Sequence, residues 1–157
     1  MLSPVFFDSC AFDGGDIDEQ RASNEIRNLF FIHSGRINVL HSVQKEINYP
    51  KTPQWVKDLA ATYIGTLQVS LTSEEQAVLS DIERIIVGDG ILENYRTDCR
   101  HIYEAQKYGR YFVTTDKRIL RRSDAIRRRV GTLYIVRPTE FVDIVKNHVK
   151  HSRRKTG

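Results

Sequence analysis

The sequence predicts an α/β protein whose sheet is covered by helices on both faces. Two short runs of β-branched and aromatic residues, Val5–Phe7 and Tyr111–Val113, are typical of strands that are buried on both sides. Longer segments, in which apolar residues recur every three or four positions, follow these runs and indicate amphipathic helices. A chain of 157 residues with 40% hydrophobic residues is expected to form one domain, over residues 1–149.

The first predicted strand ends on a carboxylate, Asp8, and a helix follows it. Asp16 and Glu19 have the spacing of a capping box, in which each side chain binds the other residue's backbone N–H. The apolar periodicity then predicts a helix up to about His33.

The middle of the chain contains a second strand and three helices. The strand is expected at residues 37–40, and it leads directly into a short helix that carries Glu46. One further helix is expected around Trp55, and another begins near Thr72 and stops at Gly88. Glu46 should therefore lie near Asp8 if the two strands are neighbours.

An α/β hairpin brings two more carboxylates to one end of the sheet. Thr97 is a suitable N-cap for a helix with Asp98 in its first turn. That helix ends at Gly109, and the strand Tyr111–Val113 runs back and leads to Asp116. Ligands of open α/β sheets bind at the carboxyl ends of the strands, so we expect the two carboxylates to form part of a site.

The C-terminal part of the chain is basic. Residues 1–100 contain 9 Lys and Arg against 15 Asp and Glu, whereas residues 101–157 contain 15 against 5. This asymmetry indicates a polyanionic partner. The densest basic cluster should contact this partner, through Lys117, Arg118, Arg121, Arg122, Arg127, Arg128 and Arg129.

After that cluster, a last strand over residues 132–136 and a helix from Pro138 complete the predicted domain. The polar, basic residues 150–157 are expected to form a mobile tail.

The candidate site consists of Asp8, Glu46, Asp98 and Asp116. Carboxylates gathered in a partly buried site oppose one another's ionisation, and a divalent cation removes that conflict. Oxygen ligands without His or Cys favour Mg²⁺ or Mn²⁺, which suit phosphoryl chemistry. The sequence has no Gly-rich phosphate loop and no evident Ser-His-Asp set.

This arrangement resembles the PIN-domain family of metal-dependent nucleases, which includes VapC-type toxins. Asp98 and Asp116 are separated by 17 residues, and Asp116 closes the run Phe112-Val113-Thr114-Thr115-Asp116, which is similar to the family's Thr-x-Asp signature. Asp8 after the first strand, and a Glu 38 residues later, follow the same order. The resemblance covers nearly the whole chain.

The resemblance implies a three-layer α/β/α sandwich with a mainly parallel central sheet. It also implies an endoribonuclease that hydrolyses phosphodiesters with a water activated by Mg²⁺ or Mn²⁺. Asp8, Glu46, Asp98 and Asp116 would be the metal ligands, and Thr114 would orient carboxylates through hydrogen bonds. Homodimers and an antitoxin partner are common in such proteins and are expected partners here.

Two alternatives stay open. Many members have Asn or Ser near the position of Cys10, and no further acid closely follows Asp116, which would suit a catalytically inactive RNA-binding or protein-interaction module. A receiver-like phosphoacceptor domain is a weaker alternative: Arg137-Pro138 follows a strand, but Arg replaces the expected Lys.

Composition excludes several other classes. The two cysteines, Cys10 and Cys99, form no zinc-ligand or disulfide pattern. The purely apolar runs are far shorter than the ~20 residues that span a bilayer, so no membrane association is expected. With no signal-peptide pattern, we expect a cytoplasmic protein.

Overall fold

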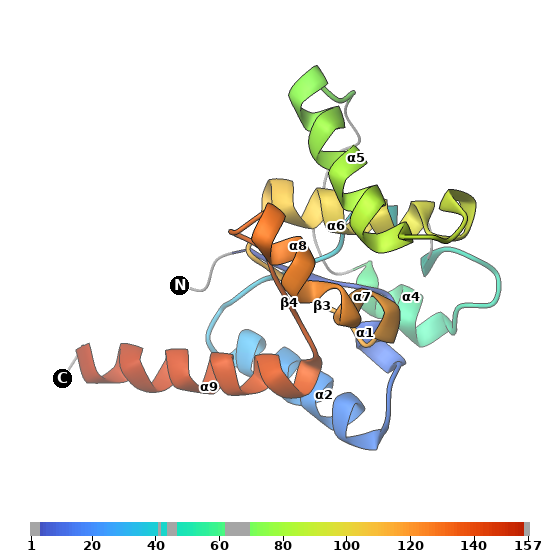
Figure 1. The fold of residues 1–157 in the computed structure, drawn as a ribbon. Coiled ribbons are helices and arrows are strands. Elements are labelled where there is room, and N and C mark those ends of the chain that lie inside the picture. The colour runs from blue at the N-terminus through green and yellow to red at the C-terminus, as the bar shows by residue number, and fades with distance from the viewer. Residues whose placement is uncertain (1–3, 41, 44–46, 62–69, 156–157) are drawn as a thin grey trace.

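The structure is a computed structural model that describes residues 4–40, 42–43, 47–61 and 70–155. Its central sheet has the strand order β2-β1-β3-β4, and all pairs of neighbouring strands are parallel. The strands are β1 (Val5–Phe7), β2 (Ile37–Asn38), β3 (Tyr111–Val113) and β4 (Tyr134–Val136). Helices flank the sheet (Figure 1), which confirms the predicted α/β class and the parallel sheet of a three-layer fold.

The order of the strands creates a switch point between β1 and β3. Val5 of β1 is opposite Ile37 of β2 on one side and opposite Tyr111 of β3 on the other. The chain therefore leaves β1 toward one edge of the sheet and later continues from β3 toward the other edge. Ligands of open α/β sheets bind in the crevice that such a divergence leaves at the carboxyl ends of the strands.

Helices α2 and α9 pack against each other and cover one face of the sheet (Figure 1). This layer contains α1 (Cys10–Asp13), α2 (Ile17–Ile32) and α9 (Pro138–Lys155). Asp16 caps α2 as predicted, because its carboxylate accepts the backbone N–H of Glu19 at 3.0 Å. The second half of the predicted capping box is wrong. The Glu19 carboxylate instead accepts the backbone N–H and the hydroxyl of Thr139, both at 3.0 Å, and so ties α2 to the start of α9.

The C-terminal helix is longer than the sequence predicts. Pro138 begins α9 as expected, since proline is well suited to the first turn of a helix. The helix continues to Lys155, so residues 150–155 are helical, whereas the sequence predicts a mobile tail from residue 150. The basic side chains of that segment are exposed on a helix that extends beyond the packed core.

Helices α5 (Ser73–Val87) and α6 (Arg96–Tyr108) pack against each other on the opposite face of the sheet (Figure 1). The structure also describes α4 (Gln54–Ala60), the 3₁₀ helix η1 (Leu92–Asn94), α7 (Lys117–Arg121) and α8 (Ser123–Arg129). Thr72 caps α5 through a complete capping box with Glu75. Thr97 is not the N-cap of α6, because η1 leads directly into a helix that begins at Arg96. Asp98 still lies in the first turn of α6.

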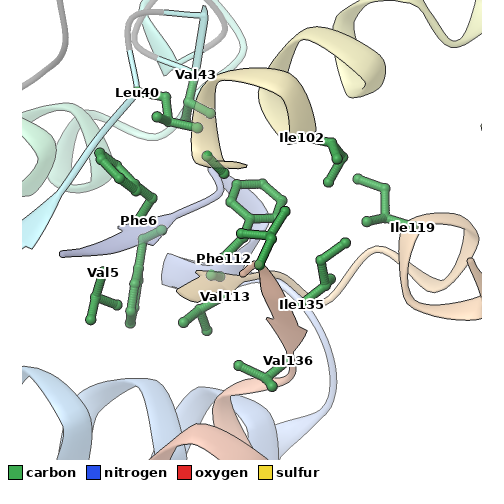
Figure 2. Packing of buried hydrophobic residues seen from close by; sticks show 14 of the residues in the cluster. Val5, Phe6, Leu40, Val43, Ile102, Phe112, Val113, Ile119, Ile135 and Val136 are labelled. Carbon is green, nitrogen blue, oxygen red and sulfur yellow. The ribbon is translucent and has the colours of Figure 1, made fainter. Parts of the chain in front are cut away.

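The core is continuous from the sheet to both helical layers (Figure 2). Phe112 and Val113 of β3 are fully buried, and Ile102 of α6 is fully buried as well. The turn between α6 and β3 needs a glycine, since a Cβ on Gly109 would lie 2.4 Å from the ring of Phe6. This close approach lets α6 pack beside β3, and it brings the first turn of α6 to the carboxyl end of the sheet.

Candidate active site

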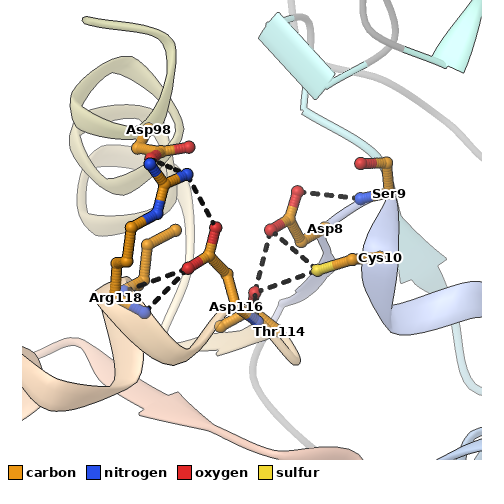
Figure 3. Close-up of polar contacts among 8 residues, drawn as sticks. Asp8, Ser9, Cys10, Asp98, Thr114, Asp116 and Arg118 are labelled. Atoms are coloured by element: carbon orange, nitrogen blue, oxygen red, sulfur yellow. Dashed lines mark hydrogen bonds and ion pairs between the residues drawn. The ribbon is translucent and has the colours of Figure 1, made fainter. Parts of the chain in front are cut away.

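Three of the predicted acids lie at the switch point between β1 and β3 (Figure 3). Asp8 directly follows β1, Asp116 follows β3, and Asp98 lies in the first turn of α6. The fourth predicted acid, Glu46, lies outside the described residues. The hairpin geometry expected from the sequence therefore agrees with the observed arrangement for Asp98 and Asp116.

Asp8 is buried, with only 5% of its surface exposed, and hydrogen bonds hold its carboxylate in place. One carboxylate oxygen accepts the backbone N–H of Ser9 at 2.8 Å, and the other accepts the hydroxyl of Thr114 at 2.8 Å. Thr114 is fully buried, and its hydroxyl oxygen accepts the backbone N–H of Asp116 at 3.1 Å. Thr114 thus connects the ends of β1 and β3, and its hydroxyl makes the kind of hydrogen bond to a site carboxylate that the sequence predicts.

Cys10 also lies beside the Asp8 carboxylate. Its Sγ lies 3.3 Å from a carboxylate oxygen of Asp8 and 3.3 Å from the hydroxyl oxygen of Thr114. Burial, and secondly the charge of Asp8, raise the pKa of the Cys10 thiol to about 12. The thiol is therefore neutral near pH 7 and serves as a weak hydrogen-bond donor rather than as a nucleophile.

Asp98 shows that the acids crowd one another. Burial, and secondly the negative charge of Asp116 together with that of Asp8, raise the pKa of Asp98 to about 6, although the positive charge of Arg118 opposes the shift. Two like charges in a partly buried site disfavour ionisation in this way. The site thus has a free-energy cost that a positive charge would relieve.

Arg118 supplies a positive charge at this position. Its Nη2 lies 3.3 Å from a carboxylate oxygen of Asp98 and 3.3 Å from one of Asp116 (Figure 3). The guanidinium also lies over the ring of Tyr95, 5.4 Å from its centroid. The sequence places Arg118 among the residues that contact RNA, whereas in the structure it bridges two of the acids. Its spacing of two residues from Asp116 is the only sequence signal for this pairing.

Asp116 also has a structural role. One of its oxygens accepts the backbone N–H groups of Arg118 at 2.8 Å and Ile119 at 3.5 Å, so Asp116 is the N-cap of α7. The other oxygen pairs with the Arg118 guanidinium. Only the second oxygen can exchange its partner without uncapping the helix.

The donor set suits a hard divalent cation once the Arg118 guanidinium moves away. Within the described part of the chain, no three Asp, Glu, His or Cys side chains are already gathered closely enough to hold a metal ion. Yet the charged acceptors that the described residues bring to the site are carboxylate oxygens, and Asp98 and Asp116 already share the Arg118 guanidinium. Asp8, Asp98 and Asp116 would hold Mg²⁺ or Mn²⁺.

No protein-family model matches this chain, and no curated protein is significantly similar to it. The resemblance to PIN domains therefore stays a prediction from the order and spacing of the acids in the sequence. Among the described helices, none is both long enough and apolar enough to cross a bilayer.

The predicted RNA-binding side chains are all exposed, on α7, on α8 and at the residue between them. They are Lys117, Arg118, Arg121, Arg122, Arg127, Arg128 and Arg129. Arg127 donates a hydrogen bond to the hydroxyl of Tyr134 at 3.0 Å, and Arg129 pairs with Asp81. Because α7 begins directly after Asp116, this basic surface borders the acids.

A separate buried polar cluster lies beside this site. The Glu104 carboxylate accepts the backbone N–H and the hydroxyl of Ser42 at 3.2 and 3.0 Å, and it pairs with Arg100. The Ser42 hydroxyl also lies 2.8 Å from Nδ1 of His101, which is buried rather than exposed. These contacts satisfy buried polar groups in the core. Glu104 is therefore engaged elsewhere and is not one of the site acids.

Proposed function

We propose that the protein is a PIN-like, divalent-metal-dependent endoribonuclease. The observation that carries the proposal is the crowding of Asp8, Asp98 and Asp116 at the switch point of a parallel sheet. This crowding raises the pKa of Asp98, and the Arg118 guanidinium lies between the carboxylates of Asp98 and Asp116. A bound Mg²⁺ or Mn²⁺ would supply the Lewis acid for hydrolysis of a phosphodiester.

The chain's own residues would prepare the site. Thr114 and Ser9 orient the Asp8 carboxylate through their hydrogen bonds. The Arg118 guanidinium pairs with Asp98 and Asp116, at the position that a bound metal ion would occupy. With a metal ion held by these carboxylates, the exposed Arg118 side chain would bind a phosphate of the substrate, for which arginine has suitable donors.

RNA as substrate is supported by the basic surface of α7 and α8 beside the acids. Lys117, Arg121 and Arg128 are exposed side chains on this surface, and lysine and arginine bind a polyanionic backbone through charge. A homodimer and an antitoxin partner stay predictions of the family resemblance, and a cytoplasmic location stays a prediction from the sequence pattern.

A cleavage assay tests this function. Single-stranded RNA is incubated with the protein in EDTA, in Mg²⁺ and in Mn²⁺. We expect cleavage only with a divalent cation, and its loss in Asp8→Asn and Asp116→Asn. Asp143→Asn, an exposed position on α9, is the matched control and should retain activity. Full activity of both site variants in folded form, or cleavage in EDTA, would show that the proposal is wrong.

A second candidate, an inactive RNA-binding module, is favoured by one observation. The Arg118 guanidinium already pairs with two of the acids, so one positive charge is present at the site without a metal ion. Calorimetric titration of Arg118→Ala with Mn²⁺ separates the two candidates. The nuclease predicts saturable binding that is tighter in Arg118→Ala than in the wild type, because the competing cation is gone. An inactive module predicts salt-dependent RNA binding, with no Mn²⁺ binding in either protein.

A further inference from the structure

A cavity of about 750 Å³ lies between the last turn of α2, the second half of α9 and the amino ends of β1 and β2. This volume is in the range of small-molecule sites in proteins. Helices α2 and α9 run side by side here (Figure 1). In a parallel sheet, all the amino ends of the strands lie on one side and all the carboxyl ends on the other. The cavity is at the amino ends and the acids are at the carboxyl ends, so the two sites lie on opposite sides of the sheet.

The wall of the cavity is apolar and largely preformed. Leu29 and Phe30 line it from α2, and Val145 and Val149 line it from α9. Phe30 is held by the ring of Phe141, with centroids 6.2 Å apart. A pocket that is organised before binding avoids part of the entropic cost of ordering its side chains.

The turn after α2 closes one end of the cavity tightly. Ser34 has a φ of 54°, in the left-handed region that residues other than glycine seldom adopt. Gly35 approaches the ring of Phe30 so closely that a Cβ would lie 2.6 Å from it. Both residues line the cavity, so its shape depends on this turn.

The polar part of the lining is basic. It contains no Asp or Glu, and its ionisable residues are His33, Arg36, His148 and Arg153. The side chains of His33, Arg36 and His148 have no hydrogen-bonding or ionic partner within the described residues. An apolar wall bordered by cationic groups is complementary to a molecule with an apolar body and one negative end.

We propose that this cavity binds a small amphiphilic anion, with its apolar body against Phe30 and Val149 and its carboxylate or phosphate at Arg36. The two headgroups share this chemistry. The inference does not depend on the proposed nuclease function, since none of the site acids lines the cavity.

Calorimetric titration with decanoate, decyl phosphate and decanol tests the proposal. We expect saturable binding of decanoate, decyl phosphate or both, with a Kd at least about tenfold lower than that for decanol, because decanol has no charge for Arg36. The tighter of the two anions identifies the headgroup. Binding of neither anion, or equal binding of decanol, would overturn the proposal, and either result would be expected if a partner protein is the true occupant.

Two variants locate the binding. Arg36→Glu reverses the charge at the proposed headgroup position and should raise the Kd for the preferred anion by at least about tenfold. Val149→Glu places a carboxylate on the apolar wall and should raise this Kd by a similar factor. Arg21→Glu makes the same charge change at an exposed position of α2 and should leave the Kd within about twofold. Asp116→Asn should also bind the anion normally. Equal weakening by Arg21→Glu would refute the assignment to this cavity.

Discussion

Asp98→Asn should stabilise the protein above pH 6 in the absence of metal ions, although it should abolish catalysis. Folding raises the pKa of Asp98 from its ordinary value of 3.8 to about 6, chiefly through burial and secondly through the charge of Asp116. At ~1.4 kcal/mol per pKa unit, the ionised carboxylate costs about 3 kcal/mol of folding free energy. The side chain is only 17% exposed, so solvent screens little of this cost.

The sign of the pH dependence follows from proton binding. The folded protein binds the Asp98 proton more tightly than the unfolded chain does, so its contribution to stability is complete below about pH 4 and is lost as the pH rises through about 6. An amide is similar to the protonated carboxyl group. The variant should therefore exceed the wild type by about 2–3 kcal/mol in free energy of unfolding at pH 8, and by almost nothing below pH 4.

Urea unfolding in EDTA, measured at pH 4, 6 and 8, checks this expectation. Asp143→Asn, an exposed carboxylate on α9, is the control and should show no such trend. Saturating Mn²⁺ should then stabilise the wild type but not Asp98→Asn, because only the wild type keeps the complete set of carboxylates. A variant less stable than the wild type at pH 8, or a difference that does not change with pH, would refute the reasoning.

Two further substitutions test contacts that join distant segments. Thr114→Val keeps the shape of a fully buried side chain but deprives the Asp8 carboxylate and the Asp116 N–H of their partner, so we expect a loss of about 1–3 kcal/mol in urea unfolding together with much reduced cleavage. Glu19→Ala removes both acceptors of Thr139 at the start of α9 and should cost about 1 kcal/mol in the same assay, with cleavage by the folded protein unchanged.

Matched controls exist for both substitutions. Thr115→Val removes a hydroxyl that donates to the carbonyl of Cys10 and touches no site carboxylate, so cleavage should persist. Glu25→Ala breaks only an exposed pair with Lys146 and should change the stability by less than about 1 kcal/mol. If Thr115→Val inactivates as strongly as Thr114→Val, the linking role of Thr114 is wrong. If Glu25→Ala lowers the free energy of unfolding as much as Glu19→Ala does, the contact of Glu19 with Thr139 does not stabilise the protein more than an exposed ion pair.

Local features were readable from the sequence because their causes are local. The apolar runs Val5–Phe7 and Tyr111–Val113 predict buried strands, and each is followed within three residues by a carboxylate that the structure places at the switch point. Asp16 and Thr72 cap their helices as expected, since an N-cap needs only the backbone N–H groups of the next turn.

The tertiary structure alone decided which distant groups become partners. Glu19 has the spacing to bind its own helix, yet it binds Thr139, which is 120 residues away. The expected mobile segment after residue 150 is helical up to Lys155, as part of the long helix α9.

Arg118 is the clearest case of this division. The sequence predicts a basic side chain for RNA on a helix that follows Asp116. Only the packing of α6 beside β3 brings Asp98 close enough to Asp116 for one guanidinium to bridge both. The sequence by itself determined the chemical identity and the chain order of the acids. Which positive charge pairs with them depends on distances through space, which sequence separation does not encode.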